Sequence, residues 1–258
     1  MEHFVREEYI ITNTKGKREK MNSALILSAG TDNQFEMNVP KQFVNVNNRP
    51  IIVYTMERFQ EHPEIDEIVV ICLDGWQEMV NAYARQFRIT KLRAVLSGGK
   101  NAQQSTYYGL QYMQEQCGMG QGDIVVIHDA IRPMVSEELI TKSIKMCRKC
   151  KMGVAAVRIM DAVIHTPNGK TGFKSINRDE IVKVQTPQAF DFEYIRDQHS
   201  RAIQEGKIGF WDNSGMLTSL GENIYFSEGS DINMKINTAE DVAMFKALYK
   251  MNQIQKEE

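Results

Sequence analysis

Short runs of β-branched and other apolar residues alternate along this chain with longer segments of helical periodicity. Parallel strands need long crossover connections, usually helical, so this alternation is typical of an α/β fold. The expected strands are 23–27, 65–73, 92–96 and 123–128, and the expected helices are 51–61, 76–86, 104–116, 136–149, 192–204 and 238–251. The sequence therefore predicts a mostly parallel sheet with flanking helices.

The four expected strands each end where glycine or polar residues begin. In an open parallel sheet, ligands bind outside the carboxyl ends of the strands. We therefore expect the loops after these strands to converge on one site.

The composition narrows the class of protein. The chain has 258 residues, 42% of them apolar and 25% charged, and a net charge of -2. Basic residues do not outnumber acidic ones, so the chain lacks the positive charge that binds a nucleic-acid backbone, and nucleic acid is not the expected partner. Apolar runs such as Ile68 to Leu73 are too short to span a bilayer, and the N-terminus lacks an apolar signal core. We expect no membrane association and a cytoplasmic location.

The cysteines are few and scattered for a chain of this length, which predicts reduced thiols. Cys147 and Cys150 have C-x-x-C spacing, as in redox motifs or half a zinc site. No second pair accompanies them in the sequence, so we interpret them as two thiols on one helical turn.

Residues 22–251 are expected to form a single domain, preceded by an extension (1–21) and followed by a tail (252–258).

Residues 154–184 interrupt the alternation of strands and helices, with two strand-like pieces separated by Pro167-Asn168-Gly169. This pattern predicts a protruding β-arm. An arm without a core of its own is usually buried by a partner, so we expect a homodimer; the alternative is a loose surface excursion.

The loop after the first strand suits a nucleotide phosphate. Its small residues Ala29 and Gly30 let backbone N–H groups approach phosphate oxygens, and Lys41 supplies positive charge. By itself the signal is weak, because the loop matches neither the P-loop nor the dinucleotide fingerprint.

Two further loops strengthen this interpretation. Gly99 and Ser105 lie around a flexible turn where a base or ribose can accept hydrogen bonds, although an ordinary capped turn has the same pattern. Asp129 directly follows a buried strand, where it can help hold Mg²⁺, and Arg132 suits a phosphate. A simple Asp–Arg surface pair is the alternative.

Together, these segments resemble the family that includes 2-C-methyl-D-erythritol 4-phosphate cytidylyltransferase and ribitol-5-phosphate cytidylyltransferase. The motifs that carry the resemblance are, in chain order, Ala29-Gly30 with Pro40-Lys41-Gln42, Gly98-Gly99 with Ser105, His128-Asp129-Ala130-Ile131-Arg132-Pro133, Gln185-Thr186-Pro187-Gln188-Ala189-Phe190, and Glu228-Gly229-Ser230 with Asn233-Met234-Lys235. The resemblance implies a Rossmann-like sheet of the nucleotide-diphospho-sugar transferase type with a dimerising arm. It also implies transfer of CMP from CTP to a polyol phosphate, with Mg²⁺ and release of pyrophosphate.

The resemblance also implies roles for individual residues. Lys41 and Lys235 would stabilise the region of the α-phosphate, and Asp129 would assist Mg²⁺ and the nucleotide. The residues implied to hold the cytidine are Ala29, Gly30, Gly99 and Ser105, and those implied to lie near the acceptor are Arg132, Ser175 and Asp212. Gln34 stands where relatives carry a catalytic arginine, seven residues before Lys41.

Departures from the family pattern motivate other hypotheses. The first loop carries Asp32 and Glu36 in place of glycines, and Ala102 replaces an arginine. A second hypothesis is therefore a nucleotide-binding homologue that lost turnover, and a third is a transferase for another base or sugar.

The sequence leaves the acceptor open between ribitol 5-phosphate and 2-C-methyl-D-erythritol 4-phosphate. Ala162 and Trp211 stand where relatives have threonine, which alters the implied acceptor pocket. Asp74-Gly75-Trp76 resembles the ribitol branch of the family.

Overall fold

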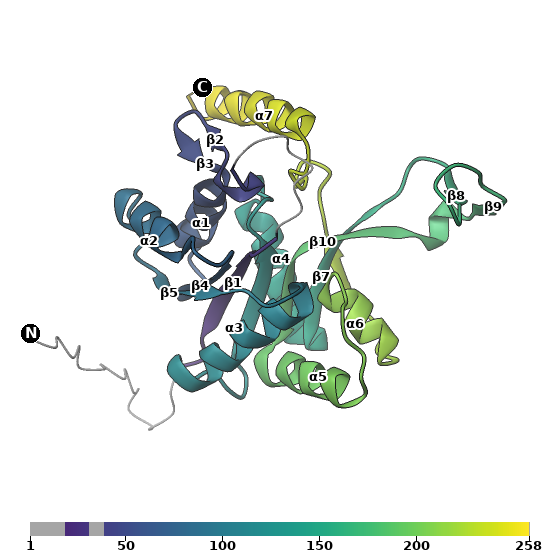
Figure 1. Ribbon diagram of the computed structural model, residues 1–258, viewed down its shortest axis with the longest axis horizontal. Helices are drawn as coiled ribbons and strands as arrows, with labels where there is room; N and C mark the ends of the chain where they lie inside the picture. Colours follow the sequence, from purple (N-terminus) through teal and green to yellow (C-terminus); the bar gives the residue numbers. More distant parts are fainter. Residues whose placement is uncertain (1–18, 31–38, 258) are drawn as a thin grey trace, which may run out of the picture.

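The computed structural model describes residues 19–30 and 39–257 (Figure 1). Most of the expected N-terminal extension, and Asp32, Gln34 and Glu36, lie outside these residues. The elements are β1 (Asn22–Ser28), η1 (Lys41–Phe43), β2 (Asn45–Val46), β3 (Arg49–Pro50), α1 (Ile51–Glu61), β4 (Glu67–Cys72), α2 (Gln77–Gln86), β5 (Leu92–Ser97), α3 (Ala102–Gln116), β6 (Ile124–Asp129), α4 (Glu137–Cys150), β7 (Met152–Arg158), β8 (Val163–His165), β9 (Lys174–Ile176), η2 (Arg178–Glu180), β10 (Val182–Asp191), α5 (Phe192–Gln204), α6 (Asn213–Ser219), β11 (Phe226–Glu228) and α7 (Ala239–Glu257).

A seven-stranded sheet in the order β11-β7-β10-β6-β1-β4-β5 forms the centre of the molecule. β1 pairs in parallel with β4 and β6, β4 with β5, and β7 with β11. Only β10 is antiparallel to its neighbours β6 and β7 in this sheet. The predicted α/β fold with a mostly parallel sheet is confirmed.

Helices cover both faces of the sheet, and the strand sequences show why (Figure 1). In β1, Ala24 and Ile26 pack into one apolar cluster, whereas Leu25 between them packs into the other. The first cluster includes residues of α1, α2 and α4, and the second includes residues of α3, α5 and α6. Strands buried on both faces read as continuous apolar runs, as these do.

The C-terminal helix α7 packs on a third apolar cluster outside the sheet. Its buried Phe245 meets the ring of Tyr54 edge to face, with ring centroids 5.1 Å apart. The helix continues to Glu257, so the tail expected over 252–258 is largely part of α7. This packing fixes the segment immediately before α7, which carries Lys235.

The protruding arm exists, but it is shorter than the predicted 154–184. Both ends of that range belong to the central sheet, because Val154 and Ala155 are buried in β7 and β10 begins at Val182. The arm proper contains the two-stranded sheet β8–β9, around Pro167-Asn168-Gly169 (Figure 1).

Sequence periodicity also missed two elements near the site. The motif residues 185–188, whose polar side chains and proline are typical of a turn, lie inside β10, where Pro187 coincides with a register irregularity between Val184 and Gln188. Proline has no N–H to donate to the ladder, which is why the sequence resembles a turn. The short helix α6 was not expected; Asp212 caps it by accepting a hydrogen bond from Gly215 N at 2.9 Å.

The described cysteines are all free, and burial raises the pKa of Cys147 to about 12. Within the described ranges, no helix is both long and apolar enough to cross a membrane.

Candidate active site

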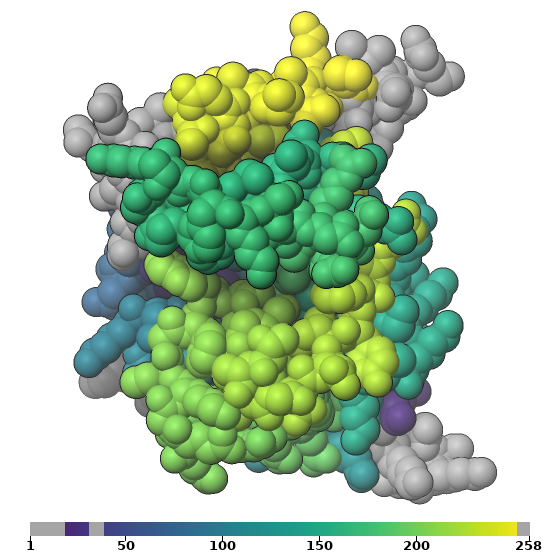
Figure 2. Space-filling view, turned by 90° about the vertical axis from the view of Figure 1, so that its right-hand side faces the viewer, coloured from purple at the N-terminus to yellow at the C-terminus, as the bar shows by residue number. Residues whose placement is uncertain are grey.

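A cavity of about 1090 Å³ lies at the carboxyl ends of β1, β4, β5 and β6. Residues from the loops after all four strands line it, including Gly30, Asp74, Gly99 and Asp129. Figure 2 shows a hollow on this side of the molecule, between the arm and the segment that carries α6. The predicted convergence of these loops on one site is confirmed.

The Gly98-Gly99 loop touches the exit of β1. A Cβ added to Gly98 would lie 2.3 Å from the Cβ of Ala29, so only glycine allows this approach. Gly98 N donates to Cys72 O at 2.8 Å, and Gly99 N donates to the Ser105 hydroxyl at 3.0 Å. The two loops are thus held together as one wall of the cavity.

Lys41 is the first residue of η1 and lines the cavity. Gln42 holds this segment against the end of β1, because its buried amide donates to Ser28 O at 2.8 Å. Lys41 is 8% exposed, and its ammonium donates to Asn237 Oδ1 at 3.0 Å. A lysine held in this way presents positive charge at a defined place in the cavity wall.

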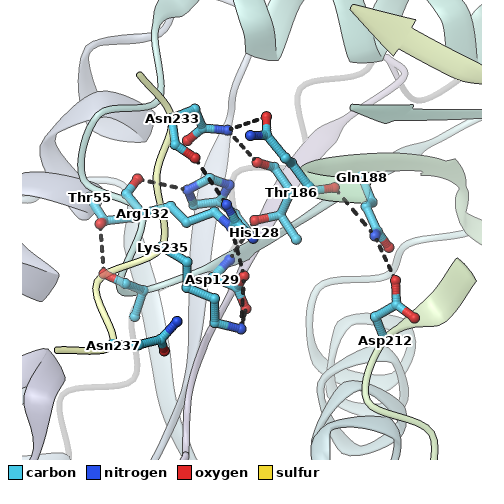
Figure 3. A network of polar contacts seen from close by, with 12 residues as sticks. Thr55, His128, Asp129, Arg132, Thr186, Gln188, Asp212, Asn233, Lys235 and Asn237 are labelled. Carbon is cyan, nitrogen blue, oxygen red and sulfur yellow. Dashed lines mark hydrogen bonds and ion pairs between the residues drawn. The ribbon is translucent and has the colours of Figure 1, made fainter. Parts of the chain in front are cut away.

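Asp129, at the end of β6, lies between two cations (Figure 3). Arg132 Nε is 2.9 Å from one carboxylate oxygen, and Lys235 Nζ is 3.3 Å from both. Burial alone would raise the pKa of Asp129, but Lys235 and Arg132 hold it well below its usual range. The carboxylate is therefore ionised, and this cluster of three charges has a net charge of about +1.

Buried polar groups hold that cluster in place (Figure 3). His128 Nε2 donates to Arg132 O at 3.1 Å, and burial lowers the pKa of His128 to about 4, so the ring is neutral. Arg132 Nη1 donates to Asn233 O at 2.9 Å, and Asn233 Nδ2 donates to Thr186 O at 2.7 Å. Asp129 N donates to the Thr186 hydroxyl at 3.0 Å, which connects β6 to β10.

A second polar group faces the cavity from β10 and α6. Gln188 Nε2 lies 3.4 Å from Asp212 Oδ2 and 3.3 Å from the Ser214 hydroxyl. Asn213 Nδ2 donates to Gln188 Oε1 at 3.3 Å. These uncharged amides and hydroxyls beside one carboxylate suit a polyhydroxylated ligand.

The model of the 2-C-methyl-D-erythritol 4-phosphate cytidylyltransferase family matches residues 23–251, which include all of the central sheet except its first residue and every residue that lines the cavity. This chain belongs to that family of cytidylyltransferases. A ribitol-5-phosphate cytidylyltransferase from Lacticaseibacillus paracasei is 39% identical, over 88% of this chain and 97% of the relative. A 2-C-methyl-D-erythritol 4-phosphate cytidylyltransferase from Clostridium botulinum is 31% identical, over 86% and 95%.

Solved structures of cytidylyltransferases share this fold. The 2-C-methyl-D-erythritol 4-phosphate cytidylyltransferase of Francisella tularensis aligns with a TM-score of 0.73 at 26% identity, over 87% of this chain and 98% of that one. The 4-diphosphocytidyl-2C-methyl-D-erythritol synthase of Anaerococcus prevotii aligns with a TM-score of 0.74 at 24% identity, over 90% and 96%. The hypothesis of a homologue without turnover gains no support from these comparisons.

The cavity brings together most of the residues that the cytidylyltransferase resemblance implied. Those that line it are Ala29, Gly30, Lys41, Gly99, Ser105, Asp129, Arg132, Asp212 and Lys235. Ser175 does not line the cavity; it is exposed on β9 in the arm. Gln34 lies outside the described residues.

Several polar residues of the site were not predicted individually. Thr186, Gln188 and Asn233 lie inside motifs that the sequence singled out, but their contacts depend on pairing between distant segments. Gln103 and Asn237 line the cavity without any sequence signal beyond their proximity to Ser105 and Lys235.

Proposed function

We propose that the protein transfers CMP from CTP to ribitol 5-phosphate, forming CDP-ribitol and pyrophosphate. The observation that supports this most directly is the pairing, in one cavity, of a glycine-lined loop with the cations Lys41, Arg132 and Lys235. Ribitol 5-phosphate is favoured over other acceptors by the relative at 39% identity and by the motif Asp74-Gly75-Trp76.

The reaction forms a bond between an acceptor phosphate oxygen and the α-phosphorus of CTP. The bond from the α-phosphorus to the bridging oxygen of the β-phosphate breaks, and pyrophosphate leaves. Negative charge accumulates on the transferring group, so fixed cations lower the barrier more than they stabilise the substrates. Lys41 and Lys235 would supply that charge, and Arg132 would bind the acceptor phosphate.

Asp129 contributes by orienting both of its cationic neighbours. Its carboxylate contacts the Lys235 ammonium and the Arg132 guanidinium at once, which restricts where each can point. The buried His128 and Asn233 fix the backbone and guanidinium of Arg132 in turn. This preorganisation reduces the rearrangement needed when the phosphates bind.

The donor set fits a Mg²⁺ ion that arrives with the nucleotide. Among the described residues, the carboxylates that line the cavity are Asp74, Asp129 and Asp212, and no group of three or more His, Cys, Asp or Glu could hold a metal ion. Mg²⁺ commonly uses one or two carboxylates with substrate phosphates and water, so Asp129 would suffice on the protein side. The ion would supply charge neutralisation for the triphosphate.

The arm supports a homodimer as part of this proposal. Met160 and Phe173 are 71% and 73% exposed, and Ile164 on β8 is half exposed. Apolar side chains gathered on a protrusion are typical of an interaction surface. In the proposed homodimer, the arm of one copy would lie at the cavity of the other, which would give Ser175 its implied place near an acceptor. A cytoplasmic location suits these substrates.

The decisive experiment measures pyrophosphate release by the purified protein with CTP, Mg²⁺ and either ribitol 5-phosphate or 2-C-methyl-D-erythritol 4-phosphate. We expect turnover with ribitol 5-phosphate and a product with the mass of CDP-ribitol. Turnover with 2-C-methyl-D-erythritol 4-phosphate alone would transfer the assignment to the second candidate, which the family model and the Clostridium botulinum relative favour.

Two other results would refute the proposed reaction itself, and not only the choice of acceptor. Pyrophosphate release only with another nucleotide would identify a transferase for a different base. Calorimetric CTP binding without release for any polyol phosphate would support the homologue without turnover.

A further inference from the structure

Gln103, in the first turn of α3, makes contacts that the proposed chemistry does not use. The side chain is 6% exposed and reaches across to the loop between α5 and α6. Its Oε1 accepts from Gly209 N at 2.8 Å and from Phe210 N at 3.4 Å. Its Nε2 donates to Lys207 O at 2.9 Å. One buried amide thus holds the backbone of this loop at three points.

The loop held in this way, residues 205–212, lines the cavity on the side where the proposed function places the acceptor. It ends at Asp212, the cap of α6, whose carboxylate lies near Gln188. Just before Asp212, Trp211 lines the cavity while 93% of its surface is exposed. A large indole exposed beside a cavity is suited to cover a ligand, because burial of its ring against carbon atoms is favourable.

Gln103 also lies beside the nucleotide side of the cavity. It is two residues from Ser105, whose hydroxyl accepts from Gly99 N, and its neighbour Gln104 accepts from Lys100 N at 2.7 Å. Gln103 and Gln104 therefore hold different loops, the first on the acceptor side and the second on the nucleotide side.

We propose that Gln103 is a positioning residue for the acceptor: it sets the path of residues 207–210, and thereby the places of Trp211 and Asp212 around the polyol. This inference rests on the proposed function for its choice of acceptor. Other contacts anchor the two ends of this segment: Lys207 N donates to Ala202 O at 2.8 Å, and Phe210 packs against the second apolar cluster. Between them, Gly209 has a φ of +89°, a conformation that residues with a side chain rarely adopt, and its N–H donates to Gln103.

The test compares substitutions that remove the amide or disturb the loop. Gln103→Met keeps the length and burial of the side chain but removes all three hydrogen bonds to the loop. We expect the KM for the acceptor to rise about tenfold, the change that roughly one lost net hydrogen bond produces. The KM for CTP should change less than about twofold, because the contacts of Gln104 and Ser105 remain.

Gly209→Ala disturbs the same loop conformation by changing the residue that donates to Gln103. A methyl group there meets no described atom within 4 Å, but it strains the backbone. We expect the same rise in acceptor KM, and a double variant with Gln103→Met that is less than additive, because both changes release one loop.

Two further glutamines serve as controls. Gln104→Met should raise the KM for CTP rather than for the acceptor. Gln60 in α1 also anchors a loop, accepting from Lys91 N at 2.9 Å, but it does not line the cavity. Gln60→Met should lower the unfolding temperature without changing either KM.

A purely structural role predicts otherwise: Gln103→Met would then lower kcat and the unfolding temperature with both KM values unchanged, and this result would overturn the proposal. If the wild type turns over no acceptor, the proposed function fails, and calorimetric binding of each polyol phosphate tests the loop instead. Binding that Gln103→Met weakens about tenfold would support the positioning role. Equal binding by both proteins, or none by the wild type, would overturn it.

Discussion

Replacing Gly98 by alanine tests whether the cavity wall depends on contact between two loops. The added Cβ would lie 2.3 Å from the Cβ of Ala29, whereas carbon atoms pack best at about 3.5–4.0 Å. One loop must therefore move by about 1.2–1.7 Å. The φ of Gly98 lies outside the left-handed region, so the cost arises from this overlap and not from backbone strain.

Overpacking of this kind typically destabilises a protein by about 1–3 kcal/mol. For a chain of this size, about 2 kcal/mol lowers the unfolding temperature by roughly 4–8 °C. We also expect the KM for CTP to rise, since Gly99 N and its contact with Ser105 move with the loop. Thermal unfolding followed by circular dichroism and steady-state kinetics measure the two effects.

The double variant Ala29→Gly with Gly98→Ala is the critical control. It removes the atom that the new Cβ meets; the next contacts are Ser105 Oγ at 3.3 Å and Cys72 O at 3.4 Å, which need only small shifts. Most of the lost stability should return. Gly120→Ala, where no described atom lies within 4 Å of the new Cβ, should leave the unfolding temperature unchanged. A single variant as stable as the wild type, or a double variant no better than the single one, would refute the reasoning.

Three further predictions concern a cavity lysine, the metal ion and two buried histidines. Lys235→Met should reduce kcat by about 10²-fold or more, as loss of one transition-state contact does elsewhere, while the fold is retained; a kcat within about twofold of the wild type would contradict this. Chelation of Mg²⁺ by EDTA should abolish pyrophosphate release and excess Mg²⁺ should restore it, whereas unchanged turnover would remove the metal from the proposal. Burial lowers the pKa of His128 and His199 to about 4 each, so the folded state favours the neutral form of both rings. Because the unfolded chain binds these protons first, each ring should cost up to about 1.4 kcal/mol of stability per pH unit as pH falls from about 6.5 to 4. Urea unfolding at pH 7 and pH 5 measures this loss, and His128→Gln should lose less than the wild type.

The sequence predicted the parallel half of the sheet well, because its strands are buried on both faces. Residues such as Val69, Val70 and Ile71 are fully buried, so these strands appear in the sequence as unbroken apolar runs. The polar residues that follow each run mark the loops at the edge of the sheet. Position along the strand was therefore enough to place Asp129 and the glycines of the Gly98-Gly99 loop at one site.

The rest of the site depends on contacts between distant segments, which local patterns do not encode. Thr186 and Pro187 resemble a turn in the sequence, yet they lie inside β10, where the Thr186 hydroxyl accepts from Asp129 N. Gln103 looks like any polar residue at the start of a helix, and only its hydrogen bonds to residues 207–210 reveal its place. Ser175 was implied by resemblance alone, and one copy of the chain does not bring it to the cavity.

The antiparallel strand β10 belongs to two parts of the molecule at once. Its first residue, Val182, pairs with Arg158 at the base of the arm, and its later residues Thr186 and Gln188 line the cavity. One continuous strand therefore connects the base of the arm to Thr186, whose hydroxyl accepts from Asp129 N. A contact that fixes the arm would restrict the same backbone that positions Asp129.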